Sequence, residues 1–509
     1  MAHDKTRAEF EARKARALAM GSTKRLAERK AAGHMNARER IDALLDAGSF
    51  VEHGLFARSY RAEDAERSPA DGVVAGFGEI DRRPVAVIAA DFTTLGASSS
   101  RVMGKKTRHV KGIAAEHGMP VVFLGECSGG RIPDLMGSDG IGAAGDASFY
   151  DRARETPWVS AILGQSYGGS TWYAMMSDAV IMRKGAIMAV ASPNVTSVAT
   201  TESVDLEELG GWRMQTEVTG QADLAVETDR DALGAVARFL SYLPSHAREA
   251  PPRAAVPAGS DEASATLLDL VPESRAKVYD VRKVLEAVVD KGSLFQIKER
   301  FARVAVTAFG RIDGWPIGIV ASNPLVKGGA LDGDACDKII SFMVLCDSFN
   351  VPIVQFADTP GFLVGVEGER RKLPSKIMNY IQALEMTTVP KFAVVMRKSY
   401  GQAYLNMGGG KSDAVAAWYS ADVGFMDPAV GVNVVHGVRQ SDDPKRYAEL
   451  AEKLGRANSA YDLAAPYFAQ AVIDPRETRH WLKRMLEVHR KRPTGGVGRH
   501  RMATWPTKF

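Results

Sequence analysis

Apolar and polar positions along the chain form short runs that predict strands and longer mixed runs that predict helices. The stretch VVAGFGEIDRRPVAVIAAD, from Val73, predicts two strands joined by a tight turn. SRVMGKKTRHVKGIAAEHG, from Ser100, predicts a helix, and PVVFLGE, from Pro120, predicts a buried strand before a glycine-rich turn. The apolar run WVSAILGQ, from Trp158, leads into the turn SYGGS and a further helix. This order predicts an α/β fold whose ligands bind at the carboxyl ends of strands.

The same pattern occurs twice along the chain. Three blocks contain matching positions: Phe77 with Phe309, Pro120 with Pro352, and Ser166 with Ser399. The first two pairs are 232 positions apart and the third pair is 233 apart. Because the offset is nearly constant across separated blocks, the sequence predicts a duplicated domain.

A stretch rich in Ala, Pro and small polar residues lies between the two copies, at 247–267. Such a composition is typical of a linker. The sequence therefore predicts an N-terminal domain over 1–250, a linker over 251–267 and a C-terminal domain over 268–509.

Composition places the chain among soluble globular proteins with two or three domains. It has 509 residues, of which 45% are hydrophobic and 25% charged, and a formal net charge of +4. Lys and Arg concentrate at both ends of the chain. These ends carry no nucleic-acid-binding motif and are interpreted as solvated helices. The three cysteines show no metal-ligand spacing, so we expect no metal and a reducing, cytoplasmic setting. No targeting peptide and no apolar run of membrane-spanning length is expected.

Two familiar motifs are incomplete or ambiguous. The GKS at 410–412 resembles the end of a phosphate-binding loop, but Leu405 stands where that loop requires its first glycine. The GQSYG at 164–168 satisfies the nucleophile-elbow pattern, which makes Ser166 a candidate nucleophile of a serine hydrolase. The second copy replaces the first glycine by Arg397 and keeps only SYG. This difference weakens the case for a serine hydrolase, which stays an alternative.

The duplicated glycine turns suggest a different chemistry. Gly168 and Gly169 follow a strand and precede a helix, so their amides can point into a pocket, and the matching turn is 401–403. Paired backbone amides form an oxyanion hole, which stabilises an enolate beside a thioester carbonyl. Two such turns imply two oxyanions, and hence two carbonyl substrates in one reaction.

At these residues the sequence resembles the carboxyltransferase β-subunits of biotin-dependent acyl-CoA carboxylases, the group that includes propionyl-CoA and methylcrotonyl-CoA carboxylase. The resemblance covers nearly the whole chain from Ala37. It rests on an ordered set of motifs: ARERIDALLDAGSFVE (37–52), SGGRI (128–132), YGGSTW (167–172), EELGGW (207–212), DTPGF (358–362) and RKSYGQAY (397–404).

The resemblance implies two duplicated crotonase-like domains and a hexamer built as a dimer of trimers, with active sites between the N-domain of one subunit and the C-domain of another. It implies that acyl-CoA binds the N-domain and carboxybiotin the C-domain. It further implies that carboxybiotin releases CO2 and that the two sets of amides hold the biotin and acyl-CoA oxyanions in turn. No side-chain base is needed. A decarboxylase or transcarboxylase would run the same half-reactions differently.

Site residues follow from the two turns and the resemblance together. The expected residues are, for catalysis, Gly168, Gly169, Gly401, Gln402 and Ala403; for acyl-CoA, Ser128, Gly129, Gly130, Arg131, Tyr167 and Ser170; for biotin, Asp358, Pro360, Gly361, Phe362 and Tyr400; and for acyl selectivity, Leu405 and Asn406. No biotin-accepting Met-Lys-Met segment and no ATP-grasp pattern is evident. A partner must then supply biotin carboxylase and the biotin carrier.

Three positions depart from the family pattern. Gln402 replaces a glycine, where a positive φ would be costly and the side chain would lie near the biotin site. Leu405 replaces an aspartate associated with acyl-chain selection, which predicts a non-standard acyl substrate. Glu126 and Cys127 stand where Asp-Ser is commoner, and Cys127 is interpreted as a buried spectator.

Overall fold

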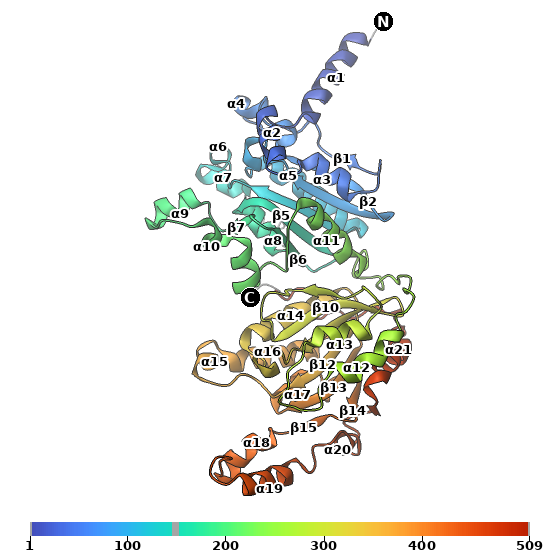
Figure 1. Cartoon of the computed structure of the whole chain (residues 1–509). Coiled ribbons are helices and arrows are strands. Elements are labelled where there is room, and N and C mark those ends of the chain that lie inside the picture. The colour runs from blue at the N-terminus through green and yellow to red at the C-terminus, as the bar shows by residue number, and fades with distance from the viewer. Residues whose placement is uncertain (1–2, 145–151, 507–509) are drawn as a thin grey trace. The chain divides into compact units, whose positions relative to one another are not determined.

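The computed structural model describes residues 3–144 and 152–506, and the chain forms two compact units, Met1–Arg248 and Glu249–Phe509. Each unit is built on a mostly parallel, eight-stranded sheet with helices packed against it (Figure 1). In unit 1 the strand order is β1-β2-β3-β4-β5-β6-β8, with β7 paired to β5. Unit 2 repeats this order as β9-β10-β11-β12-β13-β14-β16, with β15 paired to β13. The expected duplication is therefore present strand for strand.

The strands of unit 1 are β1 (Val51–Glu52), β2 (Val73–Ile80), β3 (Arg83–Ala90), β4 (Val121–Cys127), β5 (Trp158–Tyr167), β6 (Ala179–Arg183), β7 (Ile187–Ala189) and β8 (Leu224–Val226). Its helices are α1 (Asp4–Leu18), α2 (Thr23–Ala31), α3 (Ala37–Leu44), α4 (Ala62–Ala65), α5 (Arg101–His117), α6 (Ile132–Leu135), α7 (Gly137–Ala144), α8 (Gly169–Met175), α9 (Pro193–Thr200), α10 (Leu206–Gly210) and α11 (Asp229–Ser241).

The strands of unit 2 are β9 (Phe295–Ile297), β10 (Ala305–Ile312), β11 (Trp315–Ser322), β12 (Ile353–Thr359), β13 (Lys391–Tyr400), β14 (Ala414–Trp418), β15 (Asp422–Gly424) and β16 (Ala471–Ile473). Its helices are α12 (Leu267–Leu270), α13 (Val281–Val288), α14 (Gly333–Ser348), α15 (Val366–Arg370), α16 (Leu373–Met386), α17 (Gln402–Asn406), α18 (Pro428–Gly431), α19 (Pro444–Gly455), α20 (Ala460–Ala464) and α21 (Thr478–His489).

Local sequence explains the first hairpin of each unit. The β2–β3 turn places Asp81 and Arg82 at φ values of 51° and 62°, and the β10–β11 turn places Asp313 and Gly314 at 53° and 78°. Two consecutive residues with positive φ match the twist of the flanking strands. The central strands that follow, β4 and β12, are buried at every position, as expected for strands covered on both faces.

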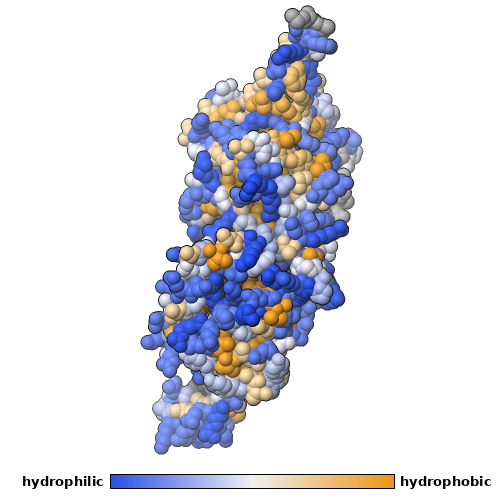
Figure 2. All heavy atoms as spheres, turned by 90° about the vertical axis from the view of Figure 1, so that its right-hand side faces the viewer, coloured by the Kyte–Doolittle hydropathy of each residue, from blue (hydrophilic) through white to orange (hydrophobic). Residues whose placement is uncertain are grey.

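Each unit has its own hydrophobic core against its sheet. In unit 1 the core includes Val73, Ile88, Phe123 and Trp158. In unit 2 it includes Val306, Ile319, Phe356, Phe392 and Trp418. On the face shown in Figure 2, hydrophobic residues form separate spots among hydrophilic ones.

The segment expected to be a linker, 251–267, packs on unit 2. Its Arg253 pairs with Asp313, and Leu267 is fully buried in the unit 2 core. The assignment of an acyl-CoA side and a biotin side to the two domains stays a prediction. Within the described ranges, no helix has the length and apolar character needed to cross a membrane.

Candidate active site: two glycine turns

The unit 1 turn joins β5 to α8 through a single glycine. Gly168 has φ 60° and ψ −121°, and its amide donates to the carbonyl of Val190 at 3.1 Å. The next two amides, of Gly169 and Ser170, begin α8 and have no hydrogen-bond acceptor among the described residues. They are therefore the donors that this turn can offer to a ligand.

The unit 2 turn repeats this geometry between β13 and α17. Gly401 has φ 59° and ψ −143°, and its amide donates to the carbonyl of Gly424 at 3.0 Å. The amides of Gln402 and Ala403 are left without an acceptor in the described part of the chain. Both turns thus use one glycine for the positive φ and the two following residues as open donors.

Gln402 is accommodated without backbone strain. It is the first residue of α17 and does not have a positive φ, which Gly401 takes instead. Its side-chain amide donates to Oδ1 of Asn406 at 2.9 Å. The glutamine therefore lies along its own helix, and its backbone amide stays free.

Arg131 and its turn in unit 1 are held by a buried ion pair. The Arg131 guanidinium donates to Asp71 at 2.6 Å and to the hydroxyl of Ser98 at 3.2 Å. Only 5% of its side chain is exposed, so it anchors the turn, whereas Ser128 and Gly130 are exposed. Ser128, Gly130 and Arg131 all line a cavity of about 730 Å³, which is large enough for part of a ligand.

The biotin-side residues of unit 2 divide into buried and exposed groups. Asp358 is fully buried and pairs with Arg397 at 3.0 Å, while the Tyr400 hydroxyl donates to Asp422 at 2.9 Å. Pro360 is exposed, and Gly361 and Phe362 are half-buried at the carboxyl end of β12. Asp358 and Tyr400 are thus placed to support the site from within.

The two expected selectivity residues also differ in access. The Leu405 side chain is 38% exposed, whereas Asn406 is fully buried and donates to the carbonyl of Ile377 at 3.0 Å. Leu405 is therefore the one of the pair that a ligand can touch.

Ser166 lacks the surroundings of a nucleophile. It is fully buried on β5, and its hydroxyl donates to the hydroxyl of Ser170 at 2.8 Å. No histidine is among its hydrogen-bond partners in the described residues. In the GKS stretch, which Leu405 already rules out as a phosphate loop, Lys411 pairs with Glu385.

Sequence reasoning missed a buried charge network behind the unit 1 turn. Glu126 accepts from Arg40 at 2.6 Å and from Arg29 at 2.5 Å. Burial would raise the pKa of Glu126, but the two guanidinium groups hold it below its ordinary value. A Cβ atom on Gly164 would lie 2.0 Å from Oε1 of Glu126, so glycine makes room for the carboxylate.

Unit 2 balances its buried acid from within its own sheet, between β12 and β13. Asp358 matches Glu126 at an offset of 232, and Arg397 matches Gly164 at an offset of 233. The guanidinium that balances the buried acid therefore comes from Arg397 on the neighbouring strand. The paired offsets were the signal that could have revealed this exchange.

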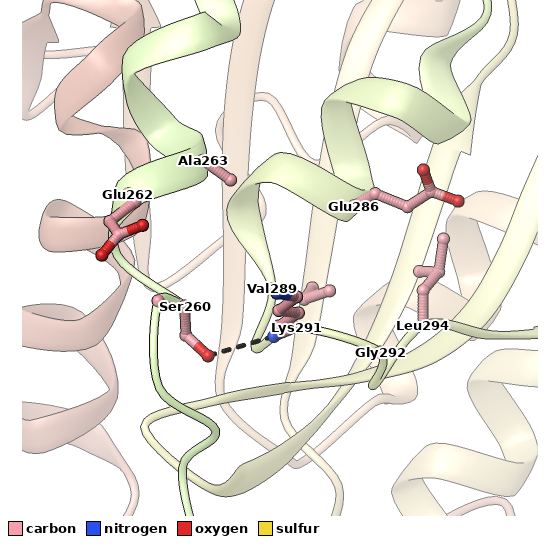
Figure 3. A pocket seen from close by; sticks show the side chains of 9 residues that line it. Ser260, Glu262, Ala263, Glu286, Val289, Lys291, Gly292 and Leu294 are labelled. Carbon is pink, nitrogen blue, oxygen red and sulfur yellow. Dashed lines mark hydrogen bonds between the residues drawn. The ribbon is translucent and has the colours of Figure 1, made fainter.

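A second cavity, of about 540 Å³, lies in unit 2 away from the turn (Figure 3). Its lining includes Ser260, which accepts from the backbone amide of Lys291 at 3.1 Å, and Leu294 just before β9. Because β10, β11 and β12 separate β9 from β13, about 19 Å of sheet lies between them. This cavity takes no part in the candidate site. Among residues 3–144 and 152–506, no three potential metal-ligating His, Cys, Asp or Glu side chains are grouped together.

Comparison with known proteins gives matches along nearly the whole chain. The sequence profile of the carboxyl transferase domain matches residues 28–502. The propionyl-CoA carboxylase carboxyltransferase subunit of Haloferax mediterranei is 36% identical over 501 residues, covering 95% of this chain and 96% of that protein. The methylmalonyl-CoA carboxyltransferase 12S subunit of Propionibacterium freudenreichii is 36% identical, covering 94% and 93%. The crystal structure of a transcarboxylase 12S hexamer with methylmalonyl-CoA bound aligns with a TM-score of 0.88 and 34% identity, covering 96% of each chain.

Proposed function

The chain belongs to the carboxyl transferase family, and we propose that it moves a carboxyl group from carboxybiotin to the α carbon of an acyl-CoA thioester. It is an enzyme of the biotin-dependent acyl-CoA carboxyltransferase class. The expected fold, α/β with two duplicated crotonase-like domains, is confirmed. The pair of matching turns is the single observation that carries the proposed mechanism.

Each turn would stabilise one oxyanion. The amides of Gly169 and Ser170 would donate to the thioester oxygen of the acyl-CoA enolate as negative charge develops there. The amides of Gln402 and Ala403 would serve the biotin side, where carboxybiotin supplies the CO2. A rigid backbone donor costs no reorganisation during the reaction, which suits a transfer that uses no side-chain base.

The remaining assignments follow the same division. Ser128 and Gly130, beside the 730 Å³ cavity, would contact acyl-CoA, and Pro360 to Phe362 would contact biotin. Arg131, Asp358 and Tyr400 would act by holding these turns in place. Leu405, an exposed apolar side chain, would favour an acyl group other than the usual short one.

Assembly and partners are proposed from the relatives. One structural relative is described as a hexamer with substrate bound to a multienzyme core. We infer a hexamer of this chain as well, with biotin carboxylase and the biotin carrier supplied by a partner subunit. The cytoplasm is the compartment we propose.

One test decides between function and a non-catalytic scaffold. The chain is purified with its biotin-carrying partner and assayed for ATP- and biotin-dependent fixation of labelled bicarbonate across acyl-CoA thioesters of increasing chain length. We expect at least one thioester to acquire label. Failure with every thioester, in a folded complex that carboxylates its own biotin, contradicts the proposed function.

The direction of transfer is part of the same test. Because the chain is 36% identical both to a propionyl-CoA carboxylase subunit and to a methylmalonyl-CoA carboxyltransferase subunit, both directions are assayed. Label that moves from a carboxylated thioester to a second acceptor, without ATP, would identify a transcarboxylase.

A further inference from the structure

The two units fasten their glycine turns in different ways. Each turn glycine donates its amide to a carbonyl at or just past the end of a three-residue strand, β7 in unit 1 and β15 in unit 2. In unit 1 this strand is held by apolar packing of Tyr167, Ile187 and Ala189, and by neutral side chains, since Gln215 and Thr171 donate to its Met188 and Ala189 carbonyls. The hydroxyl of Tyr167 has no hydrogen-bond partner within the described residues.

Unit 2 replaces this apolar contact by a charged cluster. Tyr400 corresponds to Tyr167, and its hydroxyl donates to Oδ1 of Asp422, the first residue of β15, at 2.9 Å. Asn458 donates to the same oxygen at 3.1 Å. Burial and the Asp422 carboxylate raise the pKa of the Tyr400 phenol, so it stays protonated and remains a donor.

Arg275 completes the cluster from a separate loop. Its guanidinium donates to the Tyr400 hydroxyl at 3.0 Å and pairs with Oδ2 of Asp422 at 2.5 Å. The Asp422 side chain is only 12% exposed, so its charge needs a partner, whereas Arg275 is 49% exposed. Arg275 is therefore the member of the cluster that can be changed without opening the core.

The loop that carries Arg275 is itself tied to the site. Arg397, which pairs with Asp358, also donates to the carbonyls of Pro272, Ser274 and Lys277. One continuous network thus connects the end of β12, the loop 272–277, the end of β13 and β15. Unit 1 has Gly164 and Ile187 at the positions of Arg397 and Asp422, so it cannot form this network.

The position of β15 decides where the open amides point. Its Gly424 carbonyl accepts from Gly401, which fixes the peptide before Gln402 and Ala403. β15 has only three residues; besides its ladder with β13, Asp422 forms a single bridge with Ser459 and the Val423 amide donates to the Asn458 carbonyl at 2.8 Å. The charged cluster adds side-chain contacts from Asp422 to Tyr400 of β13, and Arg275 links both of them to the loop.

We propose that Arg275 is a positioning residue for the unit 2 turn, acting through Asp422 and Tyr400 to hold the Gln402 and Ala403 amides in their donor geometry. This inference rests on the proposed carboxyl transfer. It assigns to the biotin side a dependence on loop 272–277 that the acyl-CoA side does not share.

The first experiment measures amide hydrogen exchange and needs no substrate. Arg275→Met removes the charge and keeps a side chain of similar length, and Arg275→Lys retains a cation. We expect exchange in a peptide covering 400–406 to be at least about ten-fold faster in Arg275→Met, and largely restored in Arg275→Lys. Exchange in a peptide covering 167–175 should not change, because unit 1 has no such network. The matched control is Arg253→Met, since Arg253 is 50% exposed and pairs with Asp313 at 2.7 Å in the same unit.

The second experiment uses reverse transfer from a carboxylated CoA thioester to free biotin. In this reaction the bond between the carboxylate and the α carbon breaks, a bond from that carboxylate to a biotin ureido nitrogen forms, and the proton of that nitrogen ends on the α carbon. We expect Arg275→Met to lower kcat at least about ten-fold, because misplaced donors stabilise the developing charge less. The Kd for the acyl-CoA, measured by calorimetry, should stay within two-fold of the wild-type value.

The outcomes separate the inference from the proposed function. Unchanged exchange at 400–406, equal change at both turns, or a kcat within two-fold of wild type overturns the role of Arg275. A similar rise in exchange at 400–406 or a similar fall in kcat in Arg253→Met overturns the role of Arg275 as well. A wild-type chain that transfers from no carboxylated thioester overturns the proposed function, and this inference with it.

Discussion

Gly168 and Gly401 have φ values of 60° and 59°, a backbone conformation that residues other than glycine adopt only at a cost in free energy. The repeated SYG pattern predicted both glycines, but it could not show which amides are open. That depends on the carbonyls of Val190 and Gly424, which lie more than twenty positions further along the chain. The expectation that Gly168 itself donates to a ligand therefore shifts to Gly169 and Ser170.

Replacing Gln402 by proline tests one donor amide. Proline is well tolerated at the first position of a helix, so α17 should persist, but the amide is lost. We expect kcat of carboxyl transfer to fall about 10²- to 10³-fold. Gln402→Ala is the control, because it removes the same contact to Asn406 and keeps the amide. Equal activity of the two folded variants would contradict the donor role.

Ser166→Ala separates carboxyl transfer from hydrolysis. The change removes the hydroxyl bond to Ser170 inside unit 1 and should lower the free energy of unfolding by about 1 kcal/mol. We expect kcat to stay within about three-fold of wild type, because no step uses this hydroxyl. Abolished activity in a variant with an unchanged melting profile would favour the nucleophile.

At the scale of elements, the two copies keep the same strand register but carry different side chains at some matching positions. β4 pairs with β5, and β12 with β13, with the same break just before the turn. Apolar runs and the constant offset predicted these strands, since both follow from local pattern. The sequence shows that Gly164 of the first copy corresponds to Arg397 of the second. It does not explain the difference, because the reason is the contact that each position makes with a buried acid on the neighbouring strand.

Gly164→Ala tests that contact. The new methyl group would meet a Glu126 carboxylate that Arg40 and Arg29 hold in place, so it cannot move aside cheaply. We expect the free energy of unfolding to fall by about 2 kcal/mol or more, measured in urea. Gly234→Ala in α11 is the control, because a Cβ atom there meets nothing within 4 Å and alanine favours the helix. A stable Gly164→Ala variant would show that the network adapts.

Over the whole molecule, both copies contain a buried lysine that donates to backbone carbonyls, a feature that the sequence alone did not reveal. Lys106 and Lys338 are 232 positions apart, and both are buried. Nζ of Lys106 donates to the Val73 carbonyl at 2.5 Å, and Nζ of Lys338 to the matching Ala305 carbonyl at 2.7 Å. Each lysine joins the long helix that follows the central hairpin of its unit, α5 or α14, to the start of that hairpin. The sequence around the two lysines gave no hint of these acceptors, because the acceptors are backbone carbonyls about 33 positions earlier in the chain.

Lys338 should make stability rise with pH. Burial lowers its pKa from 10.5 to about 7, with Lys298 adding to the effect. Between about pH 7 and 10.5 the unfolded chain therefore binds one more proton at this position than the folded chain. Its contribution to the free energy of unfolding should rise by about 1.4 kcal/mol per pH unit in that window. Urea unfolding at pH 7, 8 and 9 measures this slope, which Lys338→Met should reduce by that amount. Lys283→Met, at an exposed position on α13, should leave it unchanged. Equal slopes for wild type and Lys338→Met would mean that Lys338 stays charged when buried, balanced by its carbonyl acceptors.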